Sequence, residues 1–479
     1  MRPWFYAAGL EKLRARPRAK SQPIVSCKRR LVWLNNRIET KTITIKTEMN
    51  TQAVGSAYHH SLAQEEQLEP CHTQGSTKTA PEHNGLHHFT VTSEGSLPPG
   101  FQDMLAFGLI EALTGRRARR FFMGAEIPDG VLAYKSRHKP VPLSELEKLL
   151  VVTACGGNTG WHHMICRAKL YAPHLSNYSA AAGGRSFPSA AGFHTSKTFF
   201  TDDEGVYLLD NRDSSACAER APDGSLDFEA AIDAVKLRIK KVRDGRLGVP
   251  PEVPYVEAHN TWVVNQPGTL LVIPVADLAQ HLLLGLCYFL QNGAVIRDDV
   301  HGNPIAGIEK FKNIVDIENT WPLTFVEQWS LTEVTAELST SCYAGALMLQ
   351  AMGLGGWMFN GMDPFSVLGA SGNPAVPGMG FRFDTNERWP YPNPTGLAGI
   401  MEGYCPPHFS DMREAVETLC ERKFGPGGPF HPETPGLGRS LGKSDLPRRS
   451  TAWSSRNVWR FKRSIFSIAS ANSPARFLQ

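Results

Sequence analysis

The sequence lacks the usual marks of a structural metal site. Its nine cysteines are irregularly spaced and none forms a C-x-x-C pair, which argues against structural zinc and for a reducing compartment. The adjacent His162 and His163 lie between Cys155 and Cys166, but no second ligand pair follows at helical spacing. We therefore expect ordinary loop histidines here and no bound metal.

The sequence also has no long apolar run that is free of polar residues. The longest run, 269–290, contains Pro274, Asp277 and His281, and a membrane-spanning helix tolerates charge poorly at its centre. We expect no transmembrane segment. Instead, 269–273 predicts a buried strand and the remainder a buried helix. No internal repeat is found, so the chain is not a tandem duplication.

Acidic residues are scarce only at the two ends of the chain. Residues 1–48 carry 12 Lys/Arg against 3 Asp/Glu, a net charge of +9, and residues 438–479 carry 9 against 1, a net charge of +8. Because the whole chain has a net charge of +4, residues 49–437 have a net charge of −13. This pattern indicates an acidic globular body with two basic tails.

The basic N-terminal segment has three interpretations. It is a solvated tail, or a targeting peptide, since it is Arg-rich and poor in acids but lacks the apolar core of a secretory signal. In the third interpretation, translation begins at Met49 and residues 1–48 are not part of the protein. We expect a cytoplasmic protein, or an organellar one if 1–48 is a presequence.

Composition divides the 479 residues into three parts. Residues 1–97 are a basic and then polar arm, disordered or used for targeting, and 431–479 are a basic tail rich in Gly, Pro and Ser. The globular domain is expected at 98–430, with a long middle insertion at about 215–330. Helix patterns outnumber strand patterns and the two are mixed along the chain, which predicts an α+β fold.

Local patterns predict the elements of this domain. Apolar residues from Phe101 to Ala112 share one helix face, and Gly115 is a helix stop. Ser144 and Glu147 have the spacing of a capping box at the start of a second helix. Further helices are expected at 228–239, 335–352 and 412–422, a hairpin at 197–201 and 206–209, and loops at 245–257 and 370–395.

Two motifs carry most of the functional information. The first is an arginine cluster, Arg116-Arg117-Ala118-Arg119-Arg120, followed by Phe121-Phe122. Guanidinium groups present forked donors that suit a phosphate, although such a cluster is more commonly a solvated basic turn. The second motif, Gly353–Asp363, is a glycine-rich turn. Gly353 is expected to end the preceding helix in a left-handed conformation.

With a third passage, Arg185-Ser186-Phe187-Pro188-Ser189-Ala190-Ala191-Gly192, these motifs resemble those of the nitroreductase-fold FMN-dependent oxidoreductases. The closest branch is that of the thiazoline and oxazoline dehydrogenases. The cluster resembles the family's R-R-S-x-R-x-F, the third passage its R-x-x-P-S-A-G, and 351–363 its A-x-G-L-G-x-x-x-x-x-G-x-D turn. The resemblance covers about 115–213 and 335–405. It implies a central mixed or antiparallel sheet flanked by helices, and an intertwined homodimer.

The resemblance implies an FMN site built from all three motifs. Arg116 and Arg117 would contact the phosphate or the ribityl chain, with Ala118 between them and Arg120. Arg120 would lie near N1 and O2 of the isoalloxazine, where a cation favours the N1 anion of the reduced flavin.

The other two motifs would contact the ring. Residues of the third passage would lie against the flavin from one side, often across the dimer interface: Pro188, Ser189 and Ala190. The glycine-rich turn would run along the ring with a backbone N–H facing N5, through Met358, Phe359, Asn360 and Gly361. A glycine suits this position because the backbone must approach a flat ring closely.

The implied chemistry is hydride transfer through flavin N5. In one direction NAD(P)H reduces the flavin, and an electron-poor acceptor such as a nitroaromatic or a quinone reoxidises it. In the other direction a substrate C–H is oxidised and oxygen takes the electrons. The sequence identifies no acid or base, because the family's chemistry belongs mostly to the cofactor. A substrate lid and extra dimer contacts are expected in the unmatched middle.

The sequence departs from the family pattern at several positions. Ala118 stands where the family has Ser, which removes one hydroxyl contact, and Gly192 stands where many simple nitroreductases have Asn. The C-terminal cation that closes on the phosphate is not identifiable; Arg413 and Lys423 are the candidates. These departures keep open an alternative, a flavin-free binding or scaffold protein of the same fold.

Other readings concern single side chains and the tails. Trp357 and Phe359 either line a substrate site or form core beneath the flavin, and Cys342 is expected to be core rather than a nucleophile. The basic tails allow binding to nucleic acid or an anionic membrane. We expect no specific nucleic-acid partner.

Overall fold

The computed structural model describes residues 100–161, 183–211, 227–291, 293–303, 305, 307–313, 315–385, 391–426 and 428. All of them fall in the second of the chain's two units, Cys71–Gln479. The predicted arm 1–97 and tail 431–479 lie outside the described residues. The prediction that the domain spans 98–430 stays a prediction.

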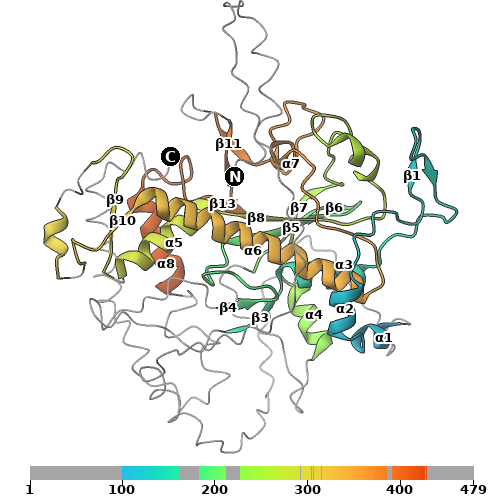
Figure 1. Cartoon of the computed structure of the whole chain (residues 1–479), viewed down its shortest axis with the longest axis horizontal. Coiled ribbons are helices and arrows are strands. Elements are labelled where there is room, and N and C mark those ends of the chain that lie inside the picture. The colour runs from blue at the N-terminus through green and yellow to red at the C-terminus, as the bar shows by residue number, and fades with distance from the viewer. Residues whose placement is uncertain are drawn as a thin grey trace, which may run out of the picture. The chain divides into compact units, whose positions relative to one another are not determined.

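The largest sheet has four antiparallel strands in the order β7-β6-β5-β8 (Figure 1). The strands are β5 (Ser196–Thr201), β6 (Gly205–Leu209), β7 (Ile239–Asp244) and β8 (Leu271–Ala276). A tight turn at 202–204 joins β5 to β6, and Phe199 pairs with Leu208. The strand segments are rich in β-branched and aromatic residues, which suit a pleated surface.

Alternation along the strands places apolar side chains on both faces of this sheet. Phe199 and Leu208 pack into a cluster that includes residues of the 247–256 loop and of 367–401. Phe200 and Leu209 point to the other face, where they pack against two helices, α3 (Glu145–Gly156) and α4 (Phe228–Lys236). Both faces of the sheet are therefore covered.

The longest helix is α6 (Leu323–Ala351, 29 residues), and several other helices pack along it (Figure 1). Its buried positions recur every three or four residues: Leu323, Val326, Ser330, Val334, Glu337, Ser341 and Gly345. The N-terminal part packs with α5 (Leu278–Gln291), which in turn packs with α8 (Met412–Phe424). The C-terminal part packs on α3, and a Cβ at Gly345 would collide with Cys155 Sγ, so glycine permits the close helix crossing.

Shorter elements complete the described fold. Three helices are α1 (Phe101–Leu105), α2 (Leu109–Gly115) and α7 (Pro364–Leu368), and 3-10 turns lie at Ala258–Val263 and Ile308–Phe311. The small sheets pair β1 (Glu126–Ile127) with β2 (Tyr134–Lys135), β3 (Asn158–Trp161) with β4 (Gly183–Arg185), β9 (Val295–Arg297) with β10 (Thr320–Pro322), and β11 (Arg382–Asp384) with β12 (Asn393–Leu397) and β13 (Met401–Glu402). None of the described helices is both long and apolar enough to cross a membrane.

Several predicted elements are confirmed. Ser144 caps α3, and its capping box with Glu147 is present. The predicted hairpin is β5–β6, and α2 ends at Gly115. The predicted helices 335–352 and 412–422 lie within α6 and α8, although α6 begins twelve residues earlier than expected. Gly353 follows α6 with a φ of 71°, the predicted left-handed conformation.

Other predicted elements are wrong in detail. The expected helix from Phe101 to Ala112 is interrupted, because Gly108 is extended and caps α2, which leaves Leu109 exposed. The expected helix 228–239 ends at Lys236, and Ile239 begins β7. The strand predicted to be buried at 269–273 is β8, an edge strand that is only half-buried. Strands β11 and part of β12 interrupt the loop expected at 370–395.

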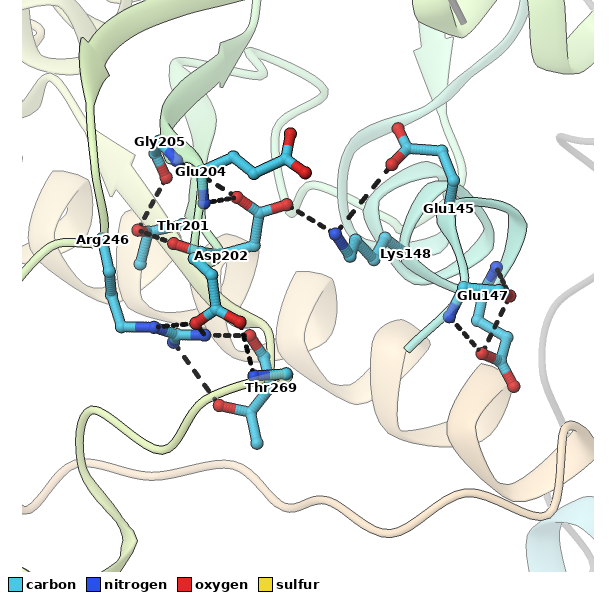
Figure 2. A network of polar contacts seen from close by, with 12 residues as sticks. Glu145, Glu147, Lys148, Thr201, Asp202, Glu204, Gly205, Arg246 and Thr269 are labelled. Carbon is cyan, nitrogen blue, oxygen red and sulfur yellow. Dashed lines mark hydrogen bonds and ion pairs between the residues drawn. The ribbon is translucent and has the colours of Figure 1, made fainter. Parts of the chain in front are cut away.

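A polar network fixes the β5–β6 turn to α3 and to the loop after β7 (Figure 2). Asp202, which is buried, accepts hydrogen bonds from Lys148 Nζ at 2.7 Å and from the backbone N–H groups of Glu204 and Gly205. Arg246 donates through Nη2 to Asp203 Oδ1 at 2.6 Å. Each cation in this network thus faces a carboxylate that is itself held by backbone donors.

Candidate functional site

The arginine cluster and the glycine-rich turn lie against each other at the C-terminal end of α6. Arg119 forms an isolated antiparallel bridge with Gly356, 237 positions further along the chain, and its Nη1 donates to Leu354 O at 3.4 Å. The Arg120 guanidinium lies 5.5 Å from the centroid of the Trp357 ring. The structure therefore brings together two motifs that the sequence separates.

Arg116 connects the cluster to α6 itself. Its guanidinium lies 5.6 Å from the centroid of the Tyr343 ring, which stands in the last third of α6. Arg117 turns back onto the end of α2, where its Nη1 donates to Thr114 O and to Arg116 O. Ala118, which stands between these arginines and Arg119, is exposed.

The four arginines lack charged partners within the described part of the chain. Arg116, Arg117, Arg119 and Arg120 form no ion pair there with any carboxylate. They donate hydrogen bonds to backbone carbonyls and to one side-chain amide oxygen. Two of the guanidinium groups also lie over aromatic rings, those of Tyr343 and Trp357. Four uncompensated cations in five residues attract an anion, because each guanidinium keeps unused forked donors.

The glycine-rich turn leaves α6 through a left-handed cap. Leu354 N–H donates to Leu349 O at 2.9 Å after Gly353, which satisfies a terminal carbonyl of the helix. Two of the four residues expected along the flavin ring, Met358 and Asn360, are exposed. Phe359 is half-buried and packs against the apolar cluster on one face of the four-stranded sheet.

The Pro188–Ala190 passage contacts α6 about one to two turns before Tyr343. Thr340 Oγ1 donates to Pro188 O at 2.9 Å, and Ser189 Oγ donates to Glu337 Oε2 at 2.6 Å. Glu337 is fully buried, and its other oxygen accepts from the backbone N–H and the hydroxyl of Ser196. Pro188 and Ala190 themselves are exposed. All three motifs therefore lie along the C-terminal half of α6.

The Gly192 departure has a backbone explanation. Gly192 adopts a φ of 65° in the turn that begins at Ser189. Glycine enters this left-handed region freely, and asparagine enters it more readily than most residues. The left-handed turn thus accounts for a glycine at this position.

The sequence did not identify the segment 255–257, which pairs with the end of the glycine-rich turn. Tyr255 O accepts from Asp363 N at 2.7 Å, Glu257 N donates to Gly361 O at 2.9 Å, and Val256 bridges Met362 between them. No motif marked this segment, because its partner lies about 105 positions further along the chain. The pairing depends on backbone groups that any sequence has.

The same segment continues into a 3-10 turn, Ala258–Val263, that faces Arg120. Asn260 is buried, and its Oδ1 accepts from Arg120 Nη1 at 3.4 Å. Trp262 stacks beside Phe122, with ring centroids 6.3 Å apart. Part of the unmatched middle therefore contributes directly to the candidate site.

Two buried polar atoms at the site have no hydrogen-bond partner among the described residues. They are Nε1 of Trp357, in the glycine-rich turn, and Oε1 of Gln350, in the last turn of α6. Gln350 also lies against Gly115, directly before the arginines. A buried group left without a partner costs free energy. Together with the unpaired arginines, these atoms fit an anionic, polar ligand such as FMN.

The candidate C-terminal cations do not complete this site within one chain. Both belong to α8, which lies beside α5 at the opposite end of α6 from α2 (Figure 1). Lys423 is buried there, close enough to Cys287 to act on the pKa of that thiol, which burial in the core raises. Arg413 is exposed on the same helix.

Two cysteines of the described part, Cys155 and Cys342, are not activated. Burial raises the pKa of Cys155 to about 12 and raises the pKa of Cys342 on α6. A raised pKa disfavours the thiolate, which is the reactive form. His162, His163 and Cys166 lie outside the described residues.

This chain matches no protein-family model, no curated protein and no solved structure. Any assignment of function therefore depends on the motifs and on the geometry described above.

Proposed function

We propose that the protein is an FMN-dependent oxidoreductase of the nitroreductase type. The arginine cluster binds the phosphate end, with Arg116 and Arg117 as the principal contacts, and Arg120 lies near the N1–O2 edge of the ring. The glycine-rich turn 353–361 runs along the ring, and the Pro188–Ala190 passage contacts it from another side. FMN supplies hydride transfer at N5 when it is bound.

One observation carries this proposal. Four arginines without carboxylate partners in the described residues lie where the arginine cluster, the glycine-rich turn and α6 meet. A basic turn without a ligand offers no reason for this convergence. A phosphate-bearing flat ligand does, because the arginines supply forked donors and the turn supplies close backbone approach.

We also propose a homodimer, in which a second copy covers apolar surface that the described residues leave open. On α6, Phe325 and Leu331 are 40% and 55% exposed. On α2, Ile110 is 74% exposed. Exposed apolar side chains at both ends of α6 are candidates for a contact with a second copy. Sedimentation equilibrium at micromolar concentration tests this point, and a monomer at all concentrations would contradict it.

The main test is the absorption spectrum of the full-length protein, purified without a tag and then incubated with excess FMN. We expect bound flavin absorbance that bleaches with NADH or NADPH under anaerobic conditions and returns on addition of a quinone. Comparing the two nucleotides, and comparing a quinone with a nitroaromatic and with oxygen, identifies the physiological direction. A cytoplasmic location is proposed from the odd number and irregular spacing of the cysteines in the sequence.

The test also separates the enzyme from its alternative. A protein that stays colourless with excess FMN would contradict the enzyme and favour a flavin-free binding or scaffold protein. Arg120→Ala is the matched variant, because its removal takes away the cation expected at the ring but no charged partner in the described fold. We expect it to retain the fold, measured by circular dichroism, and to bind flavin more weakly.

A further inference from the structure

A fully buried carboxylate lies one hydrogen bond away from the proposed flavin site. Glu337, in the C-terminal half of α6, is 0% exposed, and its Oε2 accepts from Ser189 Oγ at 2.6 Å. Its Oε1 accepts from the backbone N–H of Ser196 at 2.9 Å and from the Ser196 hydroxyl. Glu337 therefore joins α6 to the start of β5 and to the Pro188–Ala190 passage, which we place against the ring.

No cation of the described residues compensates this carboxylate. None of the ion pairs in the described part of the chain includes Glu337. Its oxygens accept three hydrogen bonds, as an ionised carboxylate does, since it has lone pairs but no hydrogen. Burial, and then the negative charge of Glu337, raise the pKa of Glu333 to about 7. A buried charge of this kind is screened by salt much less than an exposed one.

The hydrogen bond to Glu337 also determines what Ser189 can offer a ligand. A serine hydroxyl has one hydrogen and two lone pairs, and Glu337 takes the hydrogen. One lone pair faces the backbone N–H of His194 at 3.5 Å, which leaves the other for a ligand. Ser189 is half-buried, so part of it stays accessible. It can therefore accept a hydrogen bond from a ligand but cannot donate one.

We propose that Glu337 disfavours the reduced form of FMN and so lowers the midpoint potential of the bound cofactor. The inference rests on the proposed FMN-dependent function. Hydride transfer from NAD(P)H adds one negative charge to the ring, and the nicotinamide becomes NAD(P)+. A buried anion nearby and a hydroxyl that cannot donate both oppose this added charge, but they oppose neutral oxidised FMN much less. Glu337 acts through Ser189 and through its charge, so it is a positioning residue and does not touch the ring.

The effect of Glu337 is opposite to that of Arg120. Arg120 favours the N1 anion, but it is exposed, whereas Glu337 is buried. A lower potential makes the reduced cofactor a stronger reductant. Glu337 therefore favours electron transfer from NAD(P)H to an electron-poor acceptor over the oxidation of a substrate C–H.

Glu337→Gln removes the charge with little change in shape. The Gln oxygen can keep both hydrogen bonds from Ser196, and the Gln amide can donate to Ser189 Oγ, which frees the serine hydrogen to face the ligand. Anaerobic titration of the full-length protein at pH 6.5 gives the dissociation constants of oxidised and of dithionite-reduced FMN. Relative to oxidised FMN, reduced FMN should bind on the order of tenfold more tightly to the variant than to wild type. That change raises the two-electron midpoint potential by about 30 mV.

Glu333→Gln is the matched control. Glu333 lies one turn earlier on the same helix and is also largely buried, with 14% of its side chain exposed. At pH 6.5, below its pKa of about 7, it carries a proton, so the exchange replaces one neutral group with another. The ratio of the two dissociation constants should stay at its wild-type value. Circular dichroism checks that both variants fold.

The charge itself is tested without FMN, by infrared spectroscopy at pH 8. A protonated carboxyl group absorbs at a higher frequency than an ionised carboxylate. Glu333 is ionised at this pH, so wild type should show no band of a buried protonated carboxyl group. Such a band, present in wild type and in Glu333→Gln, would contradict an ionised Glu337, and this measurement does not depend on the folding of Glu337→Gln.

The titrations separate this inference from the proposed function. If both forms of FMN bind and Glu337→Gln leaves the ratio of their dissociation constants unchanged, the inference is wrong and the proposed function stands. If neither form of FMN binds to wild type, both are wrong.

Discussion

Two groups of cationic side chains in this protein differ in whether a carboxylate lies beside them. In the network of Figure 2, Lys148 and Arg246 each face a carboxylate at 2.7 and 2.6 Å, and both cations are largely buried. In the arginine cluster, Arg116 and Arg120 face aromatic rings and no carboxylate of the described residues. Satisfied charges hold a fold together, whereas unsatisfied charges on a fixed backbone are available to a ligand.

The difference also predicts how each region responds to change. Removing a partner from the satisfied network leaves a buried charge behind, so the loss appears in stability. Removing an arginine from the cluster leaves no charge unpaired among the described residues, so the loss appears in binding. The predictions below test this separation, beginning with the largest expected effect.

Asp202→Ala should destabilise the protein most. It leaves Lys148, a largely buried cation, with only Glu145 at 3.9 Å, and it removes the acceptor of two turn N–H groups. Breaking a buried pair in this way costs about 3–5 kcal/mol, measured as the free energy of unfolding in urea.

The control for this loss is Asp244→Ala. Asp244 pairs with Lys241 at 2.6 Å, but its side chain is 94% exposed. Exposed pairs contribute little, so this variant should unfold close to wild type. Equal losses in the two variants would contradict the claim that the β5–β6 network is special.

Arg116→Ala should weaken FMN binding without destabilising the fold. A hydrogen bond to a charged group contributes about 1.5–3 kcal/mol, so the dissociation constant should rise roughly 10- to 100-fold. Quenching of flavin fluorescence measures it. Arg246→Ala is the reverse case: it should lower the midpoint of thermal unfolding and leave the affinity for FMN unchanged.

Glu333 extends the comparison of paired and unpaired charges to an acidic side chain, because it faces no cation in the described fold. Burial raises its pKa from 4.5 to about 7, and burial lowers the pKa of the neighbouring His281, 3.5 Å away, to about 4. The folded protein therefore keeps the Glu333 proton between pH 4.5 and 7, where the unfolded chain has lost it. This contribution to stability falls as pH rises through that window.

Glu333→Gln should accordingly gain stability relative to wild type, and the gain should grow between pH 5 and pH 8. Thermal unfolding at several pH values measures it. His281 acts in the opposite direction, since its lowered pKa removes stability as pH falls from 6.5 towards 4. A difference between variant and wild type that does not change with pH would contradict the assignment of the raised pKa to Glu333.

Ala118→Ser should have the smallest effect. Ala118 is exposed between the arginines, at the position where the resembled family has a serine hydroxyl. One neutral hydrogen bond contributes about 0.5–1.5 kcal/mol, so FMN should bind up to about tenfold more tightly. A weaker affinity would show that this side chain does not face the ligand.

Local signals predicted much of the fold. The capping box at Ser144, the acidic turn between β5 and β6 and the left-handed Gly353 each act within a few residues, so the sequence displays them directly. The break at Gly108 and the early start of α6 depend on packing between distant segments, which periodicity does not record.

The candidate site was predictable only in its parts. The sequence identified the three motifs through a resemblance, and the structure places them along one half of α6. It did not identify Glu257 or Asn260, because their contacts with Gly361 and Arg120 join segments more than a hundred positions apart. Nor did composition predict that Glu337 would anchor Ser189 from within a buried helix face.

The most direct test of the central claim is a calorimetric comparison of FMN with riboflavin, titrated into the full-length protein at low and moderate salt. The two ligands share the ring and the ribityl chain and differ in the phosphate. If the unpaired arginines bind the phosphate, FMN should bind at least tenfold more tightly than riboflavin, and the difference should shrink as salt increases. Equal affinities, or no binding of either ligand, would contradict the account.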